Sequence, residues 1–595
     1  MKRFSGLRGM VRFIPIVIIT LGIVFRISHL DAKVYWGDEV YSSLRIFGHS
    51  TQTLVKTVAT SQPVSAEILQ QFQQKSPSLG VADTVKVLAK EDAHLPPLYF
   101  VLARLWADVF GDSIVALRSL SVLFSLLALP CFYGLALELF GQVSVAWMMV
   151  LLAVSSPVQL VFAQEARFYS LWVLTTALAS WCLLRALRQK TWMSWGIFTL
   201  TLILNLYGQF LALLTLAGYG VYVLLTHYWG QQQPIVTGNA TAIDAPASDA
   251  LPPGYVGRPF YAMRGEASGA TAAMGATAAS GIAASVSLPS FDLWRWRSVG
   301  QFMLASGLGV LAFVPWLWIY LTRTQVNNHD RIDQSTSLVN LARSWFVNFS
   351  RLFIDFNWDA ASPKPVLLVL ALATLGCVAV VAWALYRMCR EVPLQTSLFV
   401  IVLIGLIPLL LVKMALHGAF PARYLLPTYM GIHLALAYGL GTRLSVLTNP
   451  PQRRVYSAIA AAILGVGLLS CASNVNAEAW WHKQFSNCNP AIARRVNQAT
   501  RPLIISDGSG GVFFDHALSN LLSLAHYVSP QTQFQIAIAP QVPQVAAGFS
   551  EQFVVTPSQT LVKGLAAQSK SGALIPLQSL TQEYRESLVC LWQLD

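Results

Sequence analysis

A succession of apolar stretches, each long enough to cross a lipid bilayer, constrains this chain more than any other feature. A bilayer core is about 30 Å thick, and a helix of about 20 apolar residues spans it. Because lipid offers no hydrogen-bond partners to the backbone, such stretches are expected to be helical. We predict a polytopic α-helical membrane protein with about eleven spans, near residues 11–29, 113–139, 142–162, 168–187, 191–206, 208–227, 298–322, 364–387, 395–413, 424–444 and 454–473.

The composition agrees with a membrane protein and argues against other classes. Of the 595 residues, 55% are apolar and 11% are charged, whereas soluble domains carry about 25% charged residues. A net charge of +13 can indicate nucleic-acid binding, but here the basic residues lie in short clusters between apolar stretches, where they act as topology signals. We therefore expect membrane lipids as partners and no nucleic acid.

The basic clusters also predict which loops face outward. They precede the first span, follow the fourth and the eighth, and separate the last two, and short basic loops remain cytoplasmic. The basic and then apolar N-terminus lacks a clear small-x-small cleavage site, which favours an uncleaved span over a signal peptide. With this topology the outer segments are residues 30–112, 163–167, 206–208, 323–363, 414–423 and the chain from 474.

Three regions depart from the pattern of apolar spans. The segment "PPLYFVLARLWADVFG" has Arg104 and Asp108 on one helical face, which predicts an amphipathic helix at the outer membrane surface. Residues 229–297, rich in Gly, Ala and Ser, cannot bury enough apolar surface to fold and are predicted to be a disordered cytoplasmic insert. It interrupts a transmembrane catalytic domain expected at residues 1–473.

The C-terminal residues 474–595 have a different character. The runs "PLIISD", "QFQIAIA", "QFVVT" and "SLVCLWQLD" read as short strands, and "GVFFDHALSNLLSLAHYV" reads as a helix. They predict a small extracytoplasmic α/β domain. Cys488 and Cys590 lie in this region and could pair, which sequence alone does not decide.

Most of the unusual polar sequence falls in the predicted outer segments. Each of these residues has an ordinary explanation when taken alone, as a solvated loop acid, an interfacial histidine or a snorkelling arginine. However, outer arginines run against the positive-inside bias, and several ionisable groups near the membrane indicate a site. The motifs are "GDE" with Asp38 and Glu39, "HLPPLYF" with His94, "QEARFYSL" with Gln164, Glu165, Arg167 and Tyr169, "NLYGQF" with Tyr207 and Gln209, and "HGAFPARYLLP" with His417, Arg423 and Tyr424.

Together these residue types fit sugar transfer from a lipid-linked phosphosugar. Arginines bind phosphate through charge-assisted, often bidentate hydrogen bonds. An adjacent acid can take the proton of an attacking hydroxyl. A phosphate leaving group is already anionic, so it needs charge stabilisation more than a general acid. A lipid carrier would present that phosphate at the depth of these arginines.

In their order, spacing and shared side, the motifs resemble those of the GT-C glycosyltransferases. The resemblance is strongest to family 39 and its relatives, which include protein O-mannosyltransferase, aminoarabinose transferase and RgtA/B/C/D-like bacterial enzymes, and it covers roughly residues 10–445. It implies a polyprenyl-phosphate sugar donor, transfer outside the cytoplasmic membrane and inversion at the anomeric carbon. By the same analogy we expect the bacterial plasma membrane rather than the endoplasmic reticulum.

The resemblance also implies roles for single residues. Asp38 would be the catalytic base, Glu39 would orient the acceptor or help Asp38 bind a metal such as Mg²⁺ or Mn²⁺, and Arg423 would hold the donor phosphate. We therefore expect Asp38 and Arg423 to meet in one cavity beside the lipid headgroups. Further donor-site residues implied by the motifs are His94, Gln164, Glu165, Arg167, Tyr169 and Tyr424.

The chain departs from its relatives at two motifs. Many relatives read "HPP" where this chain reads "HLPP", which shifts His94 by one residue. Many carry a "THY"-like element where this chain reads "NLYGQF", so Tyr207 and Gln209 are secondary candidates, as is His417.

Two other functions are left open by the residues. A transporter or flippase for lipid-linked sugars would also need arginines near a phosphate path, although it would place ionisable groups deep in its spans and show repeated halves. A polymerase or ligase acting on lipid-linked glycans would differ mainly in donor size. The sequence identifies neither the sugar nor the acceptor, which could be a lipid, a glycan or a protein.

Overall fold

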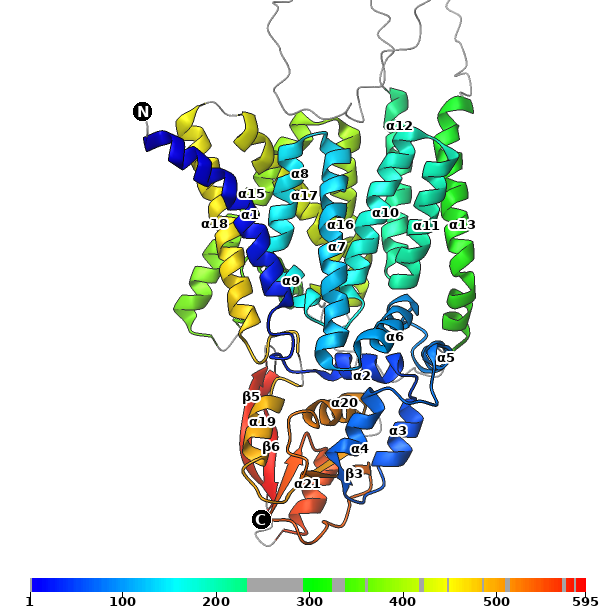
Figure 1. The fold of residues 1–595 in the computed structure, drawn as a ribbon, viewed down its shortest axis with the longest axis vertical. Coiled ribbons are helices and arrows are strands. Elements are labelled where there is room, and N and C mark those ends of the chain that lie inside the picture. The colour runs from blue at the N-terminus through cyan, green and yellow to red at the C-terminus, as the bar shows by residue number, and fades with distance from the viewer. Residues whose placement is uncertain are drawn as a thin grey trace, which may run out of the picture.

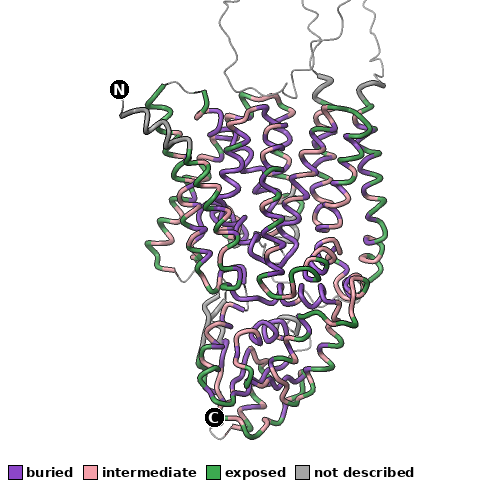
Figure 2. Tube along the Cα trace, in the orientation of Figure 1, coloured by how far each residue is buried: buried purple, intermediate pink, exposed green. Residues whose placement is uncertain are grey.

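Most of the chain forms long helices that run side by side, as the ribbon of this computed structural model shows (Figure 1). Figure 2 shows buried residues in the middle of this bundle and exposed ones along its outer helices. The structure describes residues 3–232, 293–323, 338–358, 362–416, 422–446, 449–483, 486–508, 514–569, 574–582 and 585–594. The long helices are α1 (Arg3–Ile27), α7 (Ile114–Phe140), α8 (Val143–Ser155), α10 (Tyr169–Gln189), α11 (Trp192–Gly208), α12 (Ala212–Gln232), α13 (Leu293–Arg323), α15 (Lys364–Glu391), α16 (Leu394–Leu416), α17 (Leu426–Val446) and α18 (Pro450–Val475).

Several of these helices can cross a membrane. Within the described residues, five are long and apolar enough by themselves, and a bent helix pair makes a sixth if it counts as one span. Exposed leucine, valine and isoleucine side chains on the outer helices, such as Leu311 on α13 and Leu372 on α15, suit contact with lipid tails. A multi-pass helical membrane protein is therefore confirmed, while the number of eleven spans stays a prediction.

The span predicted near residues 142–162 is not a single straight helix in the structure. The chain forms α8, which ends at Ser155, and then α9 (Pro157–Ala163), and the two are bent by 62°. Pro157 is the first residue of α9, where its missing N–H and fixed φ suit a helix start but not a helix interior. The bend turns the chain so that the "QEAR" motif follows directly at the end of the bundle.

Shorter helices lie beneath one end of the bundle (Figure 1). Among them is the predicted amphipathic helix: Arg104 Nε lies 3.3 Å from Asp108 Oδ1 on one face, and Val109 and Phe110 are exposed. The short elements are α2 (Gly37–Ile46), α3 (Thr51–Val58), α4 (Ala66–Gln70), η1 (Gln71–Gln73), α5 (Val81–Glu91) and α6 (Leu98–Phe110), with α14 (Leu338–Ser350) and η4 (Ala422–Leu425) elsewhere in the chain.

A six-stranded sheet with flanking helices lies below the short helices (Figure 1). Its strand order is β1-β3-β2-β4-β6-β5, with β2 parallel to both β3 and β4. Strand β1 comes from the first predicted outer segment and pairs with β3. The sheet therefore includes a strand from outside residues 474–595, whereas the sequence predicts an α/β domain formed by those residues alone. The elements are β1 (Val64–Ser65), α19 (Asn489–Val496), β2 (Pro502–Gly508), α20 (Phe514–Leu524), β3 (Gln533–Ile538), β4 (Glu551–Val555), α21 (Gln559–Ala566), β5 (Leu574–Gln582) and β6 (Arg585–Leu594).

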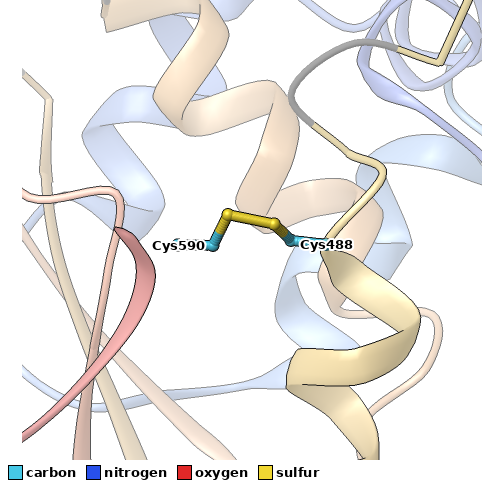
Figure 3. The surroundings of a disulfide bond; sticks show 2 residues. All are labelled: Cys488 and Cys590. Carbon is cyan, nitrogen blue, oxygen red and sulfur yellow. A yellow bond between two sulfur atoms is a disulfide. The ribbon is translucent and has the colours of Figure 1, made fainter. Parts of the chain in front are cut away.

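Two further expectations concern the cysteine pair and the predicted cytoplasmic insert. Cys488 and Cys590 form a disulfide with an S–S distance of 2.05 Å, which joins the start of α19 to β6 (Figure 3). Residues 233–292, the greater part of the predicted disordered insert, lie outside the described residues, and the insert's two ends belong to α12 and α13.

Candidate active site

Asp38 meets two arginines from distant parts of the chain. Its Oδ2 lies 3.2 Å from Nη1 of Arg423 and 3.5 Å from Nη2 of Arg167. Asp38 lies in the first turn of α2, Arg167 in the turn between α9 and α10, and Arg423 in η4, just before α17. The expected meeting of Asp38 with Arg423, 385 residues apart, is therefore present in the structure.

The two acids of the "GDE" motif have different surroundings. Both occupy the first turn of α2, where negative charge interacts favourably with the helix dipole. Successive residues of a helix point about 100° apart, so Asp38 is 30% exposed while Glu39 is 0% exposed. Asp38 therefore faces an accessible space, and Glu39 faces the interior.

Glu39 is the centre of a buried ionic network. Its Oε1 accepts hydrogen bonds from Arg118 Nε and from the backbone N–H of Ala166, both at 2.8 Å. Its Oε2 accepts from Arg118 Nη2 and from Lys483 Nζ, both at 2.7 Å. Although burial opposes ionisation, the pKa of Glu39 is lowered, because Arg118 and Lys483 stabilise its charge. Glu39 is therefore a charged structural partner of α7 and of the chain after α18.

These surroundings do not fit a divalent cation. Both oxygens of Glu39 are bound by cationic side chains, and Asp38 faces two guanidinium groups. Among the described residues, no group of three or more His, Cys, Asp or Glu could hold a metal ion. The expected metal role of Asp38 and Glu39 with Mg²⁺ or Mn²⁺ finds no support in this donor set, and we assign no chemical step to a metal.

Gln164 and Glu165 are buried behind the arginine pair. Gln164 Nε2 donates to the carbonyls of Phe25 and Ser28 at 2.7 and 2.9 Å, and its Oε1 accepts from Lys33 Nζ at 2.8 Å. Glu165 Oε1 lies 3.0 Å from His482 Nε2 and 3.3 Å from Lys483 Nζ. Although burial raises it, the net pKa of Glu165 is lowered, chiefly by the nearby charge of Lys483 and by the contact with His482. Both residues of the "QEAR" motif therefore bind protein groups.

Aromatic rings flank both guanidinium groups. The Arg167 guanidinium lies 5.0 and 5.6 Å from the ring centres of Phe168 and Tyr169, and that of Arg423 lies 5.6 Å from Tyr424 and 6.0 Å from Trp36. Such cation–π contacts fix the orientation of a guanidinium. The predicted donor-site residues Tyr169 and Tyr424 are thus brought to the arginines.

The remaining candidates divide into those near Asp38 and those away from it. His94, in the loop before α6, is exposed and interacts electrostatically with Asp38 and Arg167. Tyr207, near the end of α11, donates to the carbonyl of Ala312 on α13 at 2.9 Å, so its described contact is with a neighbouring span. Gln209 is buried directly after α11, and His417 lies outside the described residues.

Both arginines keep hydrogen-bonding capacity. The Nε–H groups of Arg167 and Arg423 are buried and have no hydrogen-bond partner within the described parts of the chain. An unpaired buried donor is costly, and at a guanidinium it suits an anion that can accept from Nε and Nη together. The pair is therefore suited to a phosphate group.

An apolar groove of about 400 Å³ lies on the helices that continue from this site. It is formed by α14, α16 and α17, and Leu425, two residues after Arg423, belongs to its wall. Its lining includes Trp345, Phe349, Pro408, Leu425, Tyr429 and Ile432. Such a surface suits a hydrocarbon chain.

Sequence reasoning missed the cations of the buried network. Arg118 lies inside the predicted span 113–139, and an ionisable residue in an apolar stretch is a signal of structural or functional importance. Lys33 and Lys483 lie in ordinary polar surroundings, so nothing in the sequence around them indicates partners more than a hundred residues away.

Comparison with known proteins adds independent evidence. Residues 94–242 match the family model described as dolichyl-phosphate-mannose-protein mannosyltransferase, a range that includes His94 and Arg167 but neither Asp38 nor Arg423. No curated protein sequence matches the chain.

Several solved structures also align with the chain, all at low identity and with TM-scores below 0.5. The chain is similar to ArnT from Cupriavidus metallidurans in the apo state, at 12% identity and a TM-score of 0.43, over 99% of this chain and 98% of that one. ArnT bound to undecaprenyl phosphate is also 12% identical, with a TM-score of 0.44, and the match covers 98% of this chain and 98% of that one. The archaeal oligosaccharyltransferase AglB from Archaeoglobus fulgidus, in complex with an inhibitory peptide and a dolichol-phosphate, is 10% identical, with a TM-score of 0.43. That match covers 88% of this chain and 64% of the other.

The family match favours an enzyme over a transporter, and it falls on the part of the chain where the "HLPP" and "QEAR" motifs lie. Over residues 94–242 the chain is therefore similar to a family of membrane glycosyltransferases, which agrees with the resemblance that the motifs indicate.

Proposed function

We propose that the protein transfers a sugar, with inversion, from a polyprenyl-phosphate donor to an acceptor hydroxyl at the outer face of a membrane. The observation that carries this proposal is the cluster of Asp38 with Arg167 and Arg423 at one end of the bundle. An acid next to two guanidinium groups supplies both requirements of the reaction, a base and a phosphate-binding pair.

The reaction follows from the charges. The acceptor hydroxyl loses its proton to Asp38 and attacks the anomeric carbon from the face opposite the phosphate. The bond between that carbon and the phosphate oxygen breaks, and its electron pair leaves with the polyprenyl phosphate, which gains one negative charge. Arg423 and Arg167 stabilise this charge as it develops. When their guanidinium groups bind phosphate, the carboxylate of Asp38 becomes available as a base.

The apolar groove supports a lipid-linked donor. Its lining includes Leu425, two residues after Arg423, so a phosphate held by the arginine would let an attached hydrocarbon chain lie against α14, α16 and α17. The family description, which names a dolichyl-phosphate sugar, agrees with such a donor.

The disulfide supports an extracytoplasmic site. Disulfides form and persist in oxidising compartments, and the Cys488–Cys590 bond belongs to the C-terminal sheet region, at the same end of the bundle as α2 (Figure 1). The basic loops predicted at the opposite end agree with this orientation. We therefore propose that the site lies on the outer face of a membrane, which by the family analogy is a bacterial plasma membrane.

A donor panel tests the proposal. Purified protein in detergent is incubated with a series of polyprenyl-phosphate sugars, and release of polyprenyl phosphate is measured. We expect release with at least one donor, since an enzyme needs no sealed vesicle. Failure with every donor, by protein that is folded and binds polyprenyl phosphate, would contradict the proposed reaction.

A further inference from the structure

We propose that the chain directly after the last membrane helix is a positioning element of the active site, in which Lys483 holds Asp38 in place through Glu39. We call residues 477–483 and 486–488 the post-span segment. This inference rests on the proposed function and deepens it, because it gives the C-terminal region a part in aligning the catalytic base.

The backbone that leads into α2 is hydrogen-bonded to the C-terminal region. Val34 N–H donates to the carbonyl of Glu478 at 2.7 Å, and Gly37 N–H donates to Ser486 Oγ at 3.2 Å. Between them, Tyr35 N–H donates to Tyr527 Oη at 2.6 Å. Buried backbone donors need partners, so this stretch depends on the C-terminal region for its conformation.

Lys483 joins the two halves of the site. Its side chain is 0% exposed, and its Nζ lies 2.7 Å from Glu39 Oε2 and 3.3 Å from Glu165 Oε1. Glu39 directly follows Asp38, and Glu165 is two residues before Arg167. Removal of one member of a buried ionic network leaves its partners uncompensated, so the lysine determines how α2 sits relative to the turn that carries Arg167.

Close packing leaves α2 little freedom to adjust. A Cβ atom on Gly37 would lie 2.6 Å from Ser519 Oγ, so the first residue of α2 contacts α20 directly. The disulfide from Cys488 to Cys590 ties the end of the post-span segment to β6 (Figure 3). The position of Asp38 thus depends on contacts with the sheet region as well as with the membrane helices.

Loss of Lys483 should affect turnover more than donor binding. A catalytic group displaced by about 1 Å can cost about 100-fold in rate, while Arg167 and Arg423 remain to bind phosphate. The loss also removes a positive charge that lowers the pKa of Glu39, so an acid limb of the pH–rate profile moves to higher pH. The other groups that face Glu39 are Arg118, Glu165, Lys33, Tyr35, Tyr99 and Tyr527.

The test uses the full-length protein and two readouts. One is kcat and KM with a donor from the panel, and the other is hydrogen–deuterium exchange of the amides of residues 34–46, which needs no activity. The variants are Lys483→Met and the conservative Lys483→Arg. The matched control is Arg494→Met, because Arg494 lies nearby on α19 in an exposed ion pair with Glu478. Ser486→Ala, which removes the acceptor of Gly37 N–H, replaces Lys483→Met if that variant does not fold.

We expect Lys483→Met to lower kcat by about 100-fold and to raise hydrogen–deuterium exchange selectively at residues 34–46. Lys483→Arg should restore much of the turnover and of the protection from exchange, and Arg494→Met should resemble wild type. Unchanged exchange, or exchange raised equally throughout the protein, would overturn the positioning role. If wild type uses no donor, the proposed function fails, and selective exchange in Lys483→Met still supports the structural half of the inference.

Discussion

Arg423→Ala should weaken use of the donor by about two orders of magnitude. Arg423 has its guanidinium between Tyr424 and Trp36 and lies 3.2 Å from Asp38, with 27% of its side chain exposed. A guanidinium that binds phosphate through two charge-assisted hydrogen bonds, each worth about 1.5 kcal/mol, contributes about 3 kcal/mol to the free energy of donor and transition-state binding. At about 1.4 kcal/mol for each factor of ten, kcat/KM falls about 100-fold.

Two further variants make this result specific. Arg423→Lys keeps the charge but loses the planar fork, so we expect about a tenfold loss. Arg188→Ala is the matched control, because Arg188 forms an ion pair with Glu138 at similar exposure, 26%, near the end of α10 that lies away from Asp38.

Initial rates are measured over a range of donor concentrations, together with the melting temperature of each variant. An unchanged kcat/KM in Arg423→Ala would refute the phosphate contact, and an equal loss in Arg188→Ala would show that the effect is one of general stability.

Three predictions concern the rest of the fold. Gly467→Ala on α18 should destabilise the protein by about 1–3 kcal/mol, because its Cβ would lie 2.4 Å from the carbonyl oxygen of Ser155. The control is Gly465→Ala, since a Cβ at Gly465 meets nothing within 4 Å. Equal melting temperatures for the two variants would contradict this prediction. Replacement of Cys488 and Cys590 by serine, which opens a loop of 102 residues, should cost about 4 kcal/mol, and a melting temperature insensitive to reductant in wild type would argue against the bond. Burial, with Arg118 and Lys483 nearby, lowers the pKa of Lys33 to about 7, so the unfolded chain binds more protons between about pH 7 and the ordinary lysine value near 10. Stability should therefore rise with pH across that window in wild type and stay flatter in Lys33→Met, and parallel curves would contradict the shift.

The meeting of Asp38 with Arg423 could be predicted from sequence because both residues flank apolar stretches. Once the spans and their direction are assigned, "GDE" and "ARY" must emerge at the same end, whatever the distance between them along the chain. The same reasoning brings Arg167 there, since it follows a stretch that ends on the same side. Span assignment thus predicts a shared depth and side for these three residues, and the roles implied by the resemblance add the expectation that Asp38 and Arg423 meet.

The contacts around Glu39 could not be predicted in this way. Depth and side do not decide which way a side chain points around its helix axis, so Asp38 and Glu39 were given neighbouring roles although only one faces the accessible space. The partners Arg118 and Lys483 come from segments 79 and 444 residues away, and such pairing depends on tertiary packing. The bend at Pro157 could not be predicted from hydropathy, which continues unbroken through it, although proline gives a local reason for it.

Transfer by the Asp38→Asn variant tests the central claim most directly. The substitution keeps the size of the side chain and removes its ability to accept a proton. With the lipid donor that wild type uses best, we expect no detectable transfer by Asp38→Asn, while its expression, membrane insertion and melting temperature stay close to those of wild type. Turnover near the wild-type rate would show that Asp38 is not the base and that the cluster with Arg167 and Arg423 does not carry the reaction.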